Sequence, residues 1–272
     1  MFQLYLIYSK ILNSGEIMSS ISTTLRLLEA ICSEKPGVTI SQLASLTKQS
    51  PSNICYYMKI LQQEGYVYKD THSGRYKASY KIADLGSRIL ANNELCEIAY
   101  PVLLKLSEEA QLTVHMAIRE ENMGVCISKV GSSKTMPSIS RIGEIFDLYP
   151  TALGKAMLAW LSEEELDEYL EQTRLKPYTP RTVTNPEKLK EQLARFRIQG
   201  YTLDEYEHTL RVRAIGVPVF DYTGKVVAAI SALLLPYHTD ADIKCMASKM
   251  KTAANEISRK LGYNDDTQVH MN

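Results

Sequence analysis

Two helix-start signals placed close together constrain this chain more than any other feature of its sequence. The run Thr39-Ile-Ser-Gln42 has the form of a capping box, in which a hydroxyl and an amide side chain satisfy backbone N–H groups that no helical partner can reach. After the polar turn Thr47-Lys48-Gln49, Ser50 can cap another helix whose first position is Pro51, a residue already suited to a helix start. The pattern therefore predicts two helices joined by a tight turn, with the second one stopping at Gly65.

The segments on either side of these two helices complete a small domain. Apolar residues recur at helical spacing from Ser22 to Cys32, which predicts a helix before the pair. Residues 66–68 and 76–78 are rich in tyrosine and alternate in polarity, and the turn formers of residues 70–74 lie between them. Three helices followed by a hairpin make a winged helix-turn-helix, which we assign to residues 18–80.

The rest of the chain mixes strands and helices. Residues 81–112 have a helical pattern with expected breaks near Asn92-Asn93 and at Pro101, and residues 81–97 are expected to form a linker helix. Residues 98–272 then predict an α+β domain. Its expected strands are residues 114–119, 125–130, 213–220 and 226–235, and its expected helices are residues 151–161, 162–171, 186–199 and 240–261.

One face of the third helix is suited to reading DNA. Steps of about 100° place Ile54, Met58 and Leu61 on a buried face and a polar set on the opposite face. The N-terminal part of a recognition helix contacts base edges, whereas later cations contact phosphate. The candidates for base readout are Ser52, Asn53 and Tyr56, and the candidate for phosphate is Lys59.

The expected wing offers three further contacts. His72, Arg75 and Lys77 can hold the DNA backbone or the adjacent minor groove. The alternative is an ordinary three-helix packing element with solvated polar faces. Charge favours DNA weakly, because residues 18–96 carry nine basic and six acidic side chains while the whole chain is neutral.

Several separated motifs lie along the chain, at residues 24–30, 40–44, 61–67, 73–76, 148–159, 200–205, 212–221 and 224–231. In this order they resemble the IclR family of bacterial transcription regulators, and they cover nearly the whole chain after Met18. The sequence departs from the family at residues 48–50, where Gly-Leu-Pro is usual, and at Tyr56, where arginine is frequent, so the operator sequence cannot be transferred.

The resemblance implies a GAF-like domain that binds a small organic acid. By motif position, the backbone amides of Ala152 and Leu153 hold the anionic group of the effector, and Asp204 and Ser231 supply side-chain hydrogen bonds. Two positions depart from the family and make the site less polar. These are Ala214, where cysteine is usual, and Leu233, where a second serine is usual.

The apolar departures favour a keto, short-chain or aromatic acid over a sugar acid, because an unpartnered buried hydroxyl costs about 1 to 3 kcal/mol. The family also implies a repressor that binds an inverted repeat as a homodimer, or as a homotetramer built as a dimer of dimers. We expect a cytoplasmic protein that uses no cofactor, no metal and no membrane: the five cysteines form no Cys-x-x-Cys pair and no apolar stretch is long enough to span a bilayer.

Two rival functions remain open from the sequence. One is a thiol-dependent enzyme on the same scaffold that uses Cys126 with His115, although a thiol in an apolar strand is usually inert. The other is a DNA-binding protein that ignores small molecules. Residues 238–242 and 163–165 suggest metal or acid chemistry, but each run is better explained as the capped start of a helix.

Residues 1–17 match nothing in the family. Gly15-Glu16 must be encoded by GGN-GAR, which can read as a purine-rich ribosome-binding site upstream of Met18. We therefore expect translation to start at Met18 and residues 1–17 to be an untranslated leader, which the mass of the natively expressed protein would decide.

Overall fold

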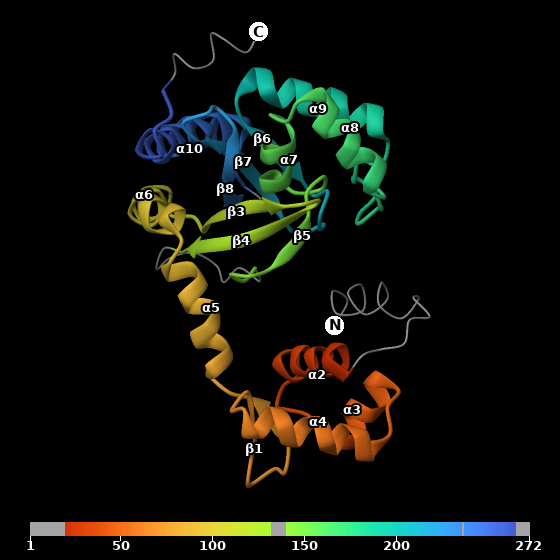
Figure 1. Ribbon diagram of the computed structural model, residues 1–272. Coiled ribbons are helices and arrows are strands. Elements are labelled where there is room, and N and C mark those ends of the chain that lie inside the picture. Colours follow the sequence, from red (N-terminus) through yellow and green to blue (C-terminus); the bar gives the residue numbers. More distant parts are fainter. Residues whose placement is uncertain (1–19, 132–139, 236, 265–272) are drawn as a thin grey trace. The chain divides into compact units, whose positions relative to one another are not determined.

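The computed structural model describes residues 20–131, 140–235 and 237–264 of the 272-residue chain. The chain divides into two compact units, one ending at Ile89 and the other beginning at Leu90 (Figure 1). The expected leader, residues 1–17, lies outside the described residues. Each unit has its own hydrophobic core.

The first unit contains helices α2 (Ser20–Ser33), α3 (Ile40–Thr47) and α4 (Pro51–Gln63) and the strands β1 (Val67–Lys69) and β2 (Tyr76–Ala78). The two strands pair antiparallel, with Val67 opposite Ala78. Helix α5 (Lys81–Ala91) follows. The predicted order of three helices and a hairpin is confirmed, to within two residues at each end of the helices.

The helix starts follow the predicted chemistry. The Thr39 hydroxyl accepts a hydrogen bond from the Gln42 amide, and the Gln42 side chain accepts one from the Thr39 amide, which completes the capping box. At α4, the Ser50 hydroxyl accepts from the amide of Asn53 and Pro51 takes the first position. Lys48 ends α3 with a φ of 55°, so the turn between the helices includes one left-handed residue. The hydrophobic core of the first unit consists of Leu27, Ala30, Ile31, Val38, Leu43, Ile54, Met58, Leu61 and Val67.

The second unit starts with a long helix that crosses the predicted break at Pro101. Helix α6 (Glu94–Ala110) follows the predicted break near Asn92-Asn93, with Asn93 as its cap, and continues through Pro101. The predicted break at Pro101 is therefore wrong. Pro101 lies on the exposed side, while Val102 and Leu106 on the other side are buried in the core, and this packing compensates for the one backbone hydrogen bond that proline cannot donate.

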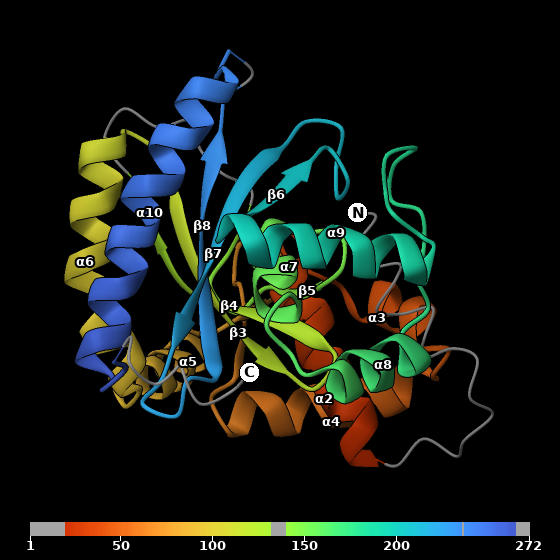
Figure 2. The same cartoon turned by 90° about the horizontal axis from the view of Figure 1, so that it is seen from above.

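A six-stranded antiparallel sheet forms the centre of this unit (Figures 1 and 2). The strand order is β5-β4-β3-β8-β7-β6. The two edge strands β5 and β6 have three and four residues and were not predicted, because such short strands leave no readable alternation of polarity. The strands are β3 (Val114–Glu120), β4 (Met123–Val130), β5 (Ile145–Asp147), β6 (Thr202–Glu205), β7 (Arg213–Phe220) and β8 (Val226–Leu234).

Helices cover both faces of the sheet. Helices α6 and α10 (Asp240–Lys260) pack side by side on one face, where the larger core cluster lies. Helices α7 (Ala152–Leu158), α8 (Glu163–Gln172) and α9 (Pro186–Gln199) cover the other face and enclose a second cluster. Helix α7 stops at Leu158, three residues before the predicted end.

Candidate functional sites

The polar face of α4 is exposed as the helical pattern predicts. Ser52, Asn53 and Lys59 are exposed and the Tyr56 side chain is 63% exposed, whereas the opposite face is buried in the core of the first unit. Asn53 Nδ2 donates to Gln49 Oε1 at 3.4 Å. The structure therefore brings the four predicted α4 contacts onto one solvent-facing surface.

The hairpin turn is organised by Asp70. Its Oδ1 accepts hydrogen bonds from the backbone amides of His72 and Ser73 and from the Ser73 hydroxyl. Its Oδ2 pairs with Lys77 Nζ at 2.8 Å. The Lys77 ammonium and the donors of Ser73 hold the pKa of the Asp70 carboxyl well below its usual range. Lys77, a predicted DNA contact, thus already has a carboxylate partner.

Arg75 points toward the segment before α3. One guanidinium nitrogen, Nη1, donates to the carbonyl of Gly37 at 2.9 Å and to Gln42 Oε1 at 3.2 Å. The sequence contained no sign of this contact, since Gly37 and Arg75 are far apart in the chain. Of the three hairpin residues predicted to contact DNA, Arg75 and Lys77 therefore have protein partners for their charged groups.

The residues predicted to bind an effector lie in two neighbouring rows on one face of the sheet. Directly opposite residues in adjacent antiparallel strands place their side chains on the same face. Asp204, Ala214 and Leu233 form one row across β6, β7 and β8. Ser231 belongs to the next row, between Gly216 of β7 and His115 of β3.

The start of α7 lies against the second of these rows. The Thr202 hydroxyl donates to the carbonyl of Ala152 at 2.7 Å, and a Cβ atom at Gly216 would lie 2.4 Å from the same oxygen. The Gly154 amide donates to the cap Thr151. Among the residues that the structure describes, the amides of Ala152 and Leu153 have no acceptor, as expected for the first positions of a helix.

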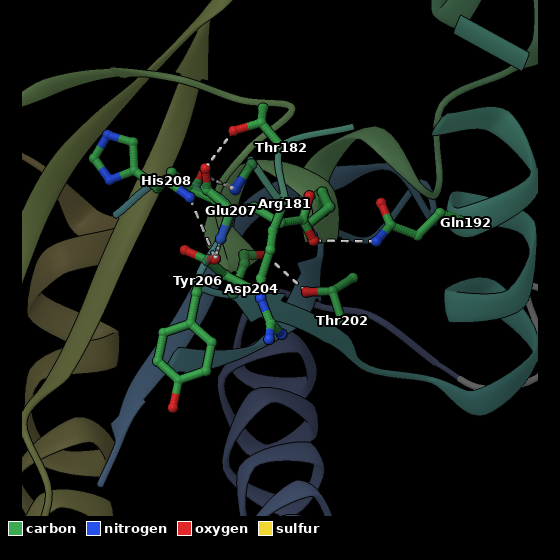
Figure 3. A network of polar contacts seen from close by, with 12 residues as sticks. Arg181, Thr182, Gln192, Thr202, Asp204, Tyr206, Glu207 and His208 are labelled. Atoms are coloured by element: carbon green, nitrogen blue, oxygen red, sulfur yellow. Dashed lines mark hydrogen bonds and ion pairs between the residues drawn. The ribbon is translucent and has the colours of Figure 1, made fainter. Parts of the chain in front are cut away.

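Asp204 is a buried carboxyl in the first row. Its Oδ1 accepts hydrogen bonds from the amides of Glu207 at 2.7 Å and His208 at 3.4 Å (Figure 3). Burial raises the pKa of Asp204 to about 7, against the opposing effects of Lys155 and of these amides. Asp204 therefore titrates near neutral pH.

A buried ion pair adjoins Asp204 that sequence reasoning did not find. Lys155 of α7 is 0% exposed, Glu207 is 5% exposed, and Nζ lies 2.5 Å from Oε1. Gln192 of α9 donates to the same Oε1 at 3.1 Å (Figure 3). Burial lowers the pKa of Lys155, although the Glu207 charge acts in the opposite direction. Glu207 therefore connects the segment after β6 to α7 through Lys155 and to α9 through Gln192.

The backbone of this segment is held from the other side by threonine hydroxyls. Thr179 Oγ1 donates to the carbonyl of Tyr206 at 2.7 Å. Thr182 Oγ1 donates to the carbonyl of Glu207 at 2.6 Å (Figure 3). Tyr206 has a φ of 66°, a left-handed conformation uncommon for a residue with a side chain. The carbonyls of Tyr206 and Glu207 are thus both held by threonines of the segment between α8 and α9.

The cysteine and the histidine considered for thiol chemistry each have another hydrogen-bond partner. The Cys126 thiol donates to the Ser128 carbonyl at 3.5 Å, and burial raises its pKa to about 11. His115 Nε2 is 2.5 Å from the Ser140 hydroxyl, and burial lowers the pKa of His115 to about 4. A thiol whose pKa is raised stays protonated and is a weak nucleophile, and His115 is hydrogen-bonded to Ser140, so this geometry does not support a thiol-dependent enzyme.

The remaining acidic runs are helix caps, as predicted. Ser162 with Glu165 and Thr239 with Asp242 complete capping boxes at the starts of α8 and α10. Within the described ranges, no group of three or more His, Cys, Asp or Glu side chains is arranged to hold a metal ion. No helix in the same ranges is long and apolar enough to cross a bilayer.

Comparison with known proteins identifies the class. Residues 87–259 match the family model described as bacterial transcriptional regulator IclR C-terminal, and residues 22–91 match one described as B-block binding subunit of TFIIIC. The regulator XynR of Escherichia coli is 31% identical, over 91% of this chain and 98% of its own. The relatives of this protein are thus bacterial transcription regulators, and the chain belongs to the IclR family.

Solved structures share the fold. The crystal structure of the Thermotoga maritima IclR is 36% identical, with a TM-score of 0.79, and the match covers 91% of this chain and all of that one. An IclR homolog from Microbacterium hydrocarbonoxydans was crystallised in complex with 4-hydroxybenzoate. That protein is 20% identical, with a TM-score of 0.75 over 89% of this chain and 99% of its own, so the likeness extends to the fold alone.

Proposed function

We infer that this protein is a DNA-binding transcription regulator whose affinity for its operator is controlled by a small organic acid bound in the second unit. Membership of a family of transcription regulators supports the first part. The single observation that carries the second part is the convergence of Asp204, Ala214, Ser231 and Leu233 with the start of α7 on one face of the sheet.

In this proposal the first unit is a winged helix-turn-helix and α4 is its recognition helix. Ser52, Asn53 and Tyr56 read base edges in the major groove, and Lys59 contacts phosphate. The exposure of these four side chains supports the assignment. A two-fold homodimer, alone or as half of a tetramer, presents two such helices to an inverted repeat.

The hairpin is the wing of this domain. His72 lies in its exposed turn and is assigned to the DNA backbone or the adjacent minor groove. Arg75 and Lys77 reach DNA only by leaving or sharing the protein partners that they already have.

The second unit is a GAF-like sensor in this proposal. A ligand carboxylate is held by the amides of Ala152 and Leu153, where the absence of other acceptors and the helix dipole favour an anion. Asp204 and Ser231 supply hydrogen bonds, and Ala214 and Leu233 meet an apolar part of the ligand. The 4-hydroxybenzoate complex of a protein with the same fold supports an organic acid as the ligand class.

Calorimetry with two classes of acid tests the sensor. Aromatic and keto acids are expected to bind the wild-type protein, whereas polyhydroxylated acids bind weakly, since a hydroxyl opposite Leu233 finds no partner. The variant Leu233→Ser should gain affinity for the hydroxylated class. The reverse result, tight binding of a sugar acid to the wild type that Leu233→Ser weakens, would contradict the assigned ligand.

The regulatory sign is tested on operator DNA. We infer a repressor, so the bound acid should release the protein from an inverted-repeat fragment. A protein that binds the fragment equally well with and without every acid, and that no acid stabilises against heat, would be the ligand-independent DNA-binding protein instead.

A further inference from the structure

The Arg75 side chain connects the hairpin to the segment that leads into α3. Building on the DNA-binding function inferred above, we propose that Arg75 is a positioning residue that fixes the hairpin against the start of α3, and that it does not serve as a phosphate contact. Among the lysines and arginines predicted to contact DNA, Lys59 then carries the phosphate contact, because its ammonium group has no protein partner in the described residues.

The argument starts from the backbone beside Arg75. Val38 and Tyr76 exchange two hydrogen bonds, from Val38 N to Tyr76 O at 3.0 Å and from Tyr76 N to Val38 O at 2.7 Å. At Gly37 a Cβ atom would lie 2.9 Å from the Tyr76 oxygen, and its φ of +120° is open to glycine. Strand β2 is therefore in close contact with the segment that leads into α3.

The Arg75 side chain adds a second connection to the same segment. Nη1 donates to the Gly37 carbonyl and to Gln42 Oε1. That Gln42 oxygen also accepts from the Thr39 amide at 3.0 Å. A single oxygen atom thus joins the capping box of α3 to the hairpin, and α3 in turn packs against the helix that reads DNA.

This arrangement differs from that of a phosphate-binding arginine. A cation that meets phosphate usually extends into solvent, where its charge neutralises the backbone and releases counterions. Arg75 is partly buried with two neutral oxygen acceptors, so its guanidinium holds two protein segments in register. Lys77 beside it is neutralised by Asp70.

Operator binding as a function of salt concentration separates the two roles. For Arg75→Ala we expect affinity to fall about ten-fold at every salt concentration, because the wing loses its orientation, with no change in the slope of log K against log salt. For Lys59→Ala the slope should fall by about 0.9, the value of one lost phosphate contact. Hydrogen exchange at the Tyr76 and Val38 amides should accelerate in Arg75→Ala and stay unchanged in Lys59→Ala.

Two more variants sharpen the test. Arg75→Lys keeps the charge, but the lysine ammonium is one bond closer to the backbone than Nη1 and cannot reach both acceptors in the same way. A positioning role therefore predicts that most of the affinity loss persists, whereas a phosphate contact predicts recovery. Thr39→Ala breaks the capping box but leaves the Arg75 contacts, and it should leave the exchange at Tyr76 close to that of the wild type.

A slope reduced by about 0.9 in Arg75→Ala, with unchanged amide exchange and full recovery in Arg75→Lys, would overturn this proposal. If Lys59→Ala also leaves the slope unchanged, the assigned DNA-reading face of α4 is wrong, which is a separate failure. The exchange data and Arg75→Lys still decide the role of Arg75 if Arg75→Ala is too unstable to bind.

Discussion

Removing one partner of the buried pair between Lys155 and Glu207 should destabilise the second unit strongly. Both side chains are almost inaccessible to solvent, and their charged atoms are 2.5 Å apart. Breaking such a pair leaves an uncompensated charge in a low-dielectric interior, which costs about 3 to 5 kcal/mol. We therefore expect Lys155→Met to lower the free energy of unfolding by an amount in that range.

The double variant should restore much of the loss. Lys155→Met with Glu207→Gln removes both charges, keeps a similar volume, and leaves an amide that accepts from Gln192, so a coupling energy of roughly 2 kcal/mol or more is expected between the two sites. Lys190→Met is the matched control, because the Lys190–Asp167 pair has the same separation but is partly exposed, and a salt-screened pair contributes little.

Tryptophan fluorescence during urea unfolding reports on this unit directly. The chain has one tryptophan, Trp160, which packs in the cluster beneath α7 and lies edge-to-face with Phe220 at 6.2 Å between ring centroids. Its transition midpoint should move strongly in Lys155→Met and little in Lys190→Met. Equal small shifts in both, or additive effects in the double variant, would refute the claim that the buried charges depend on each other.

Three other predictions concern titration and DNA reading. The pKa of Asp204 is raised from 3.8 to about 7, so the folded state keeps a proton that the unfolded state loses, and the free energy of unfolding should fall as pH rises from 4 to 7. Asp204→Asn should lack that fall, which urea unfolding at several pH values measures; a pH-independent difference would contradict it. The pKa of His115 is lowered from 6.5 to about 4, so the unfolded state binds more protons in that window and stability should fall on acidification, less steeply in His115→Asn. Tyr56→Ala should change base preference at one operator position in a selection experiment, and a uniform loss across all sequences would argue against its place in the groove.

Elements with strong local signals were predicted well from the sequence. Thr39, Ser50, Ser162 and Thr239 each cap a helix in the structure, because capping chemistry depends on residues only three positions apart. Edge strands β5 and β6 escaped prediction, since three and four residues are too few to show an alternation of polarity. At Pro101 tertiary packing overrode a local signal.

The candidate sites show the same division. The polar face of α4 follows from helical periodicity, so Ser52, Tyr56 and Lys59 could be placed without a structure. The grouping of Asp204 with Leu233 rested on family resemblance, because strand register cannot be derived from either segment alone. The contact of Arg75 with Gly37 and the pair of Lys155 with Glu207 depend on distant segments meeting, and nothing local in the sequence reports them.

The close backbone contacts around α7 fix the start of this helix, whereas the side chains that line the neighbouring strands can be exchanged. A Cβ atom at Gly154 would lie 2.1 Å from the Leu148 oxygen, and one at Gly216 would lie 2.4 Å from that of Ala152, so main chain rests on main chain on both sides of the helix start. In the proposed sensor, the place where an acid group docks is therefore set by the backbone and not by the side chains that line the strands. Under the proposed function, substitutions at Ala214 and Leu233 change which molecule is recognised while its charged end stays at the same point, so new specificities can arise without rebuilding the scaffold.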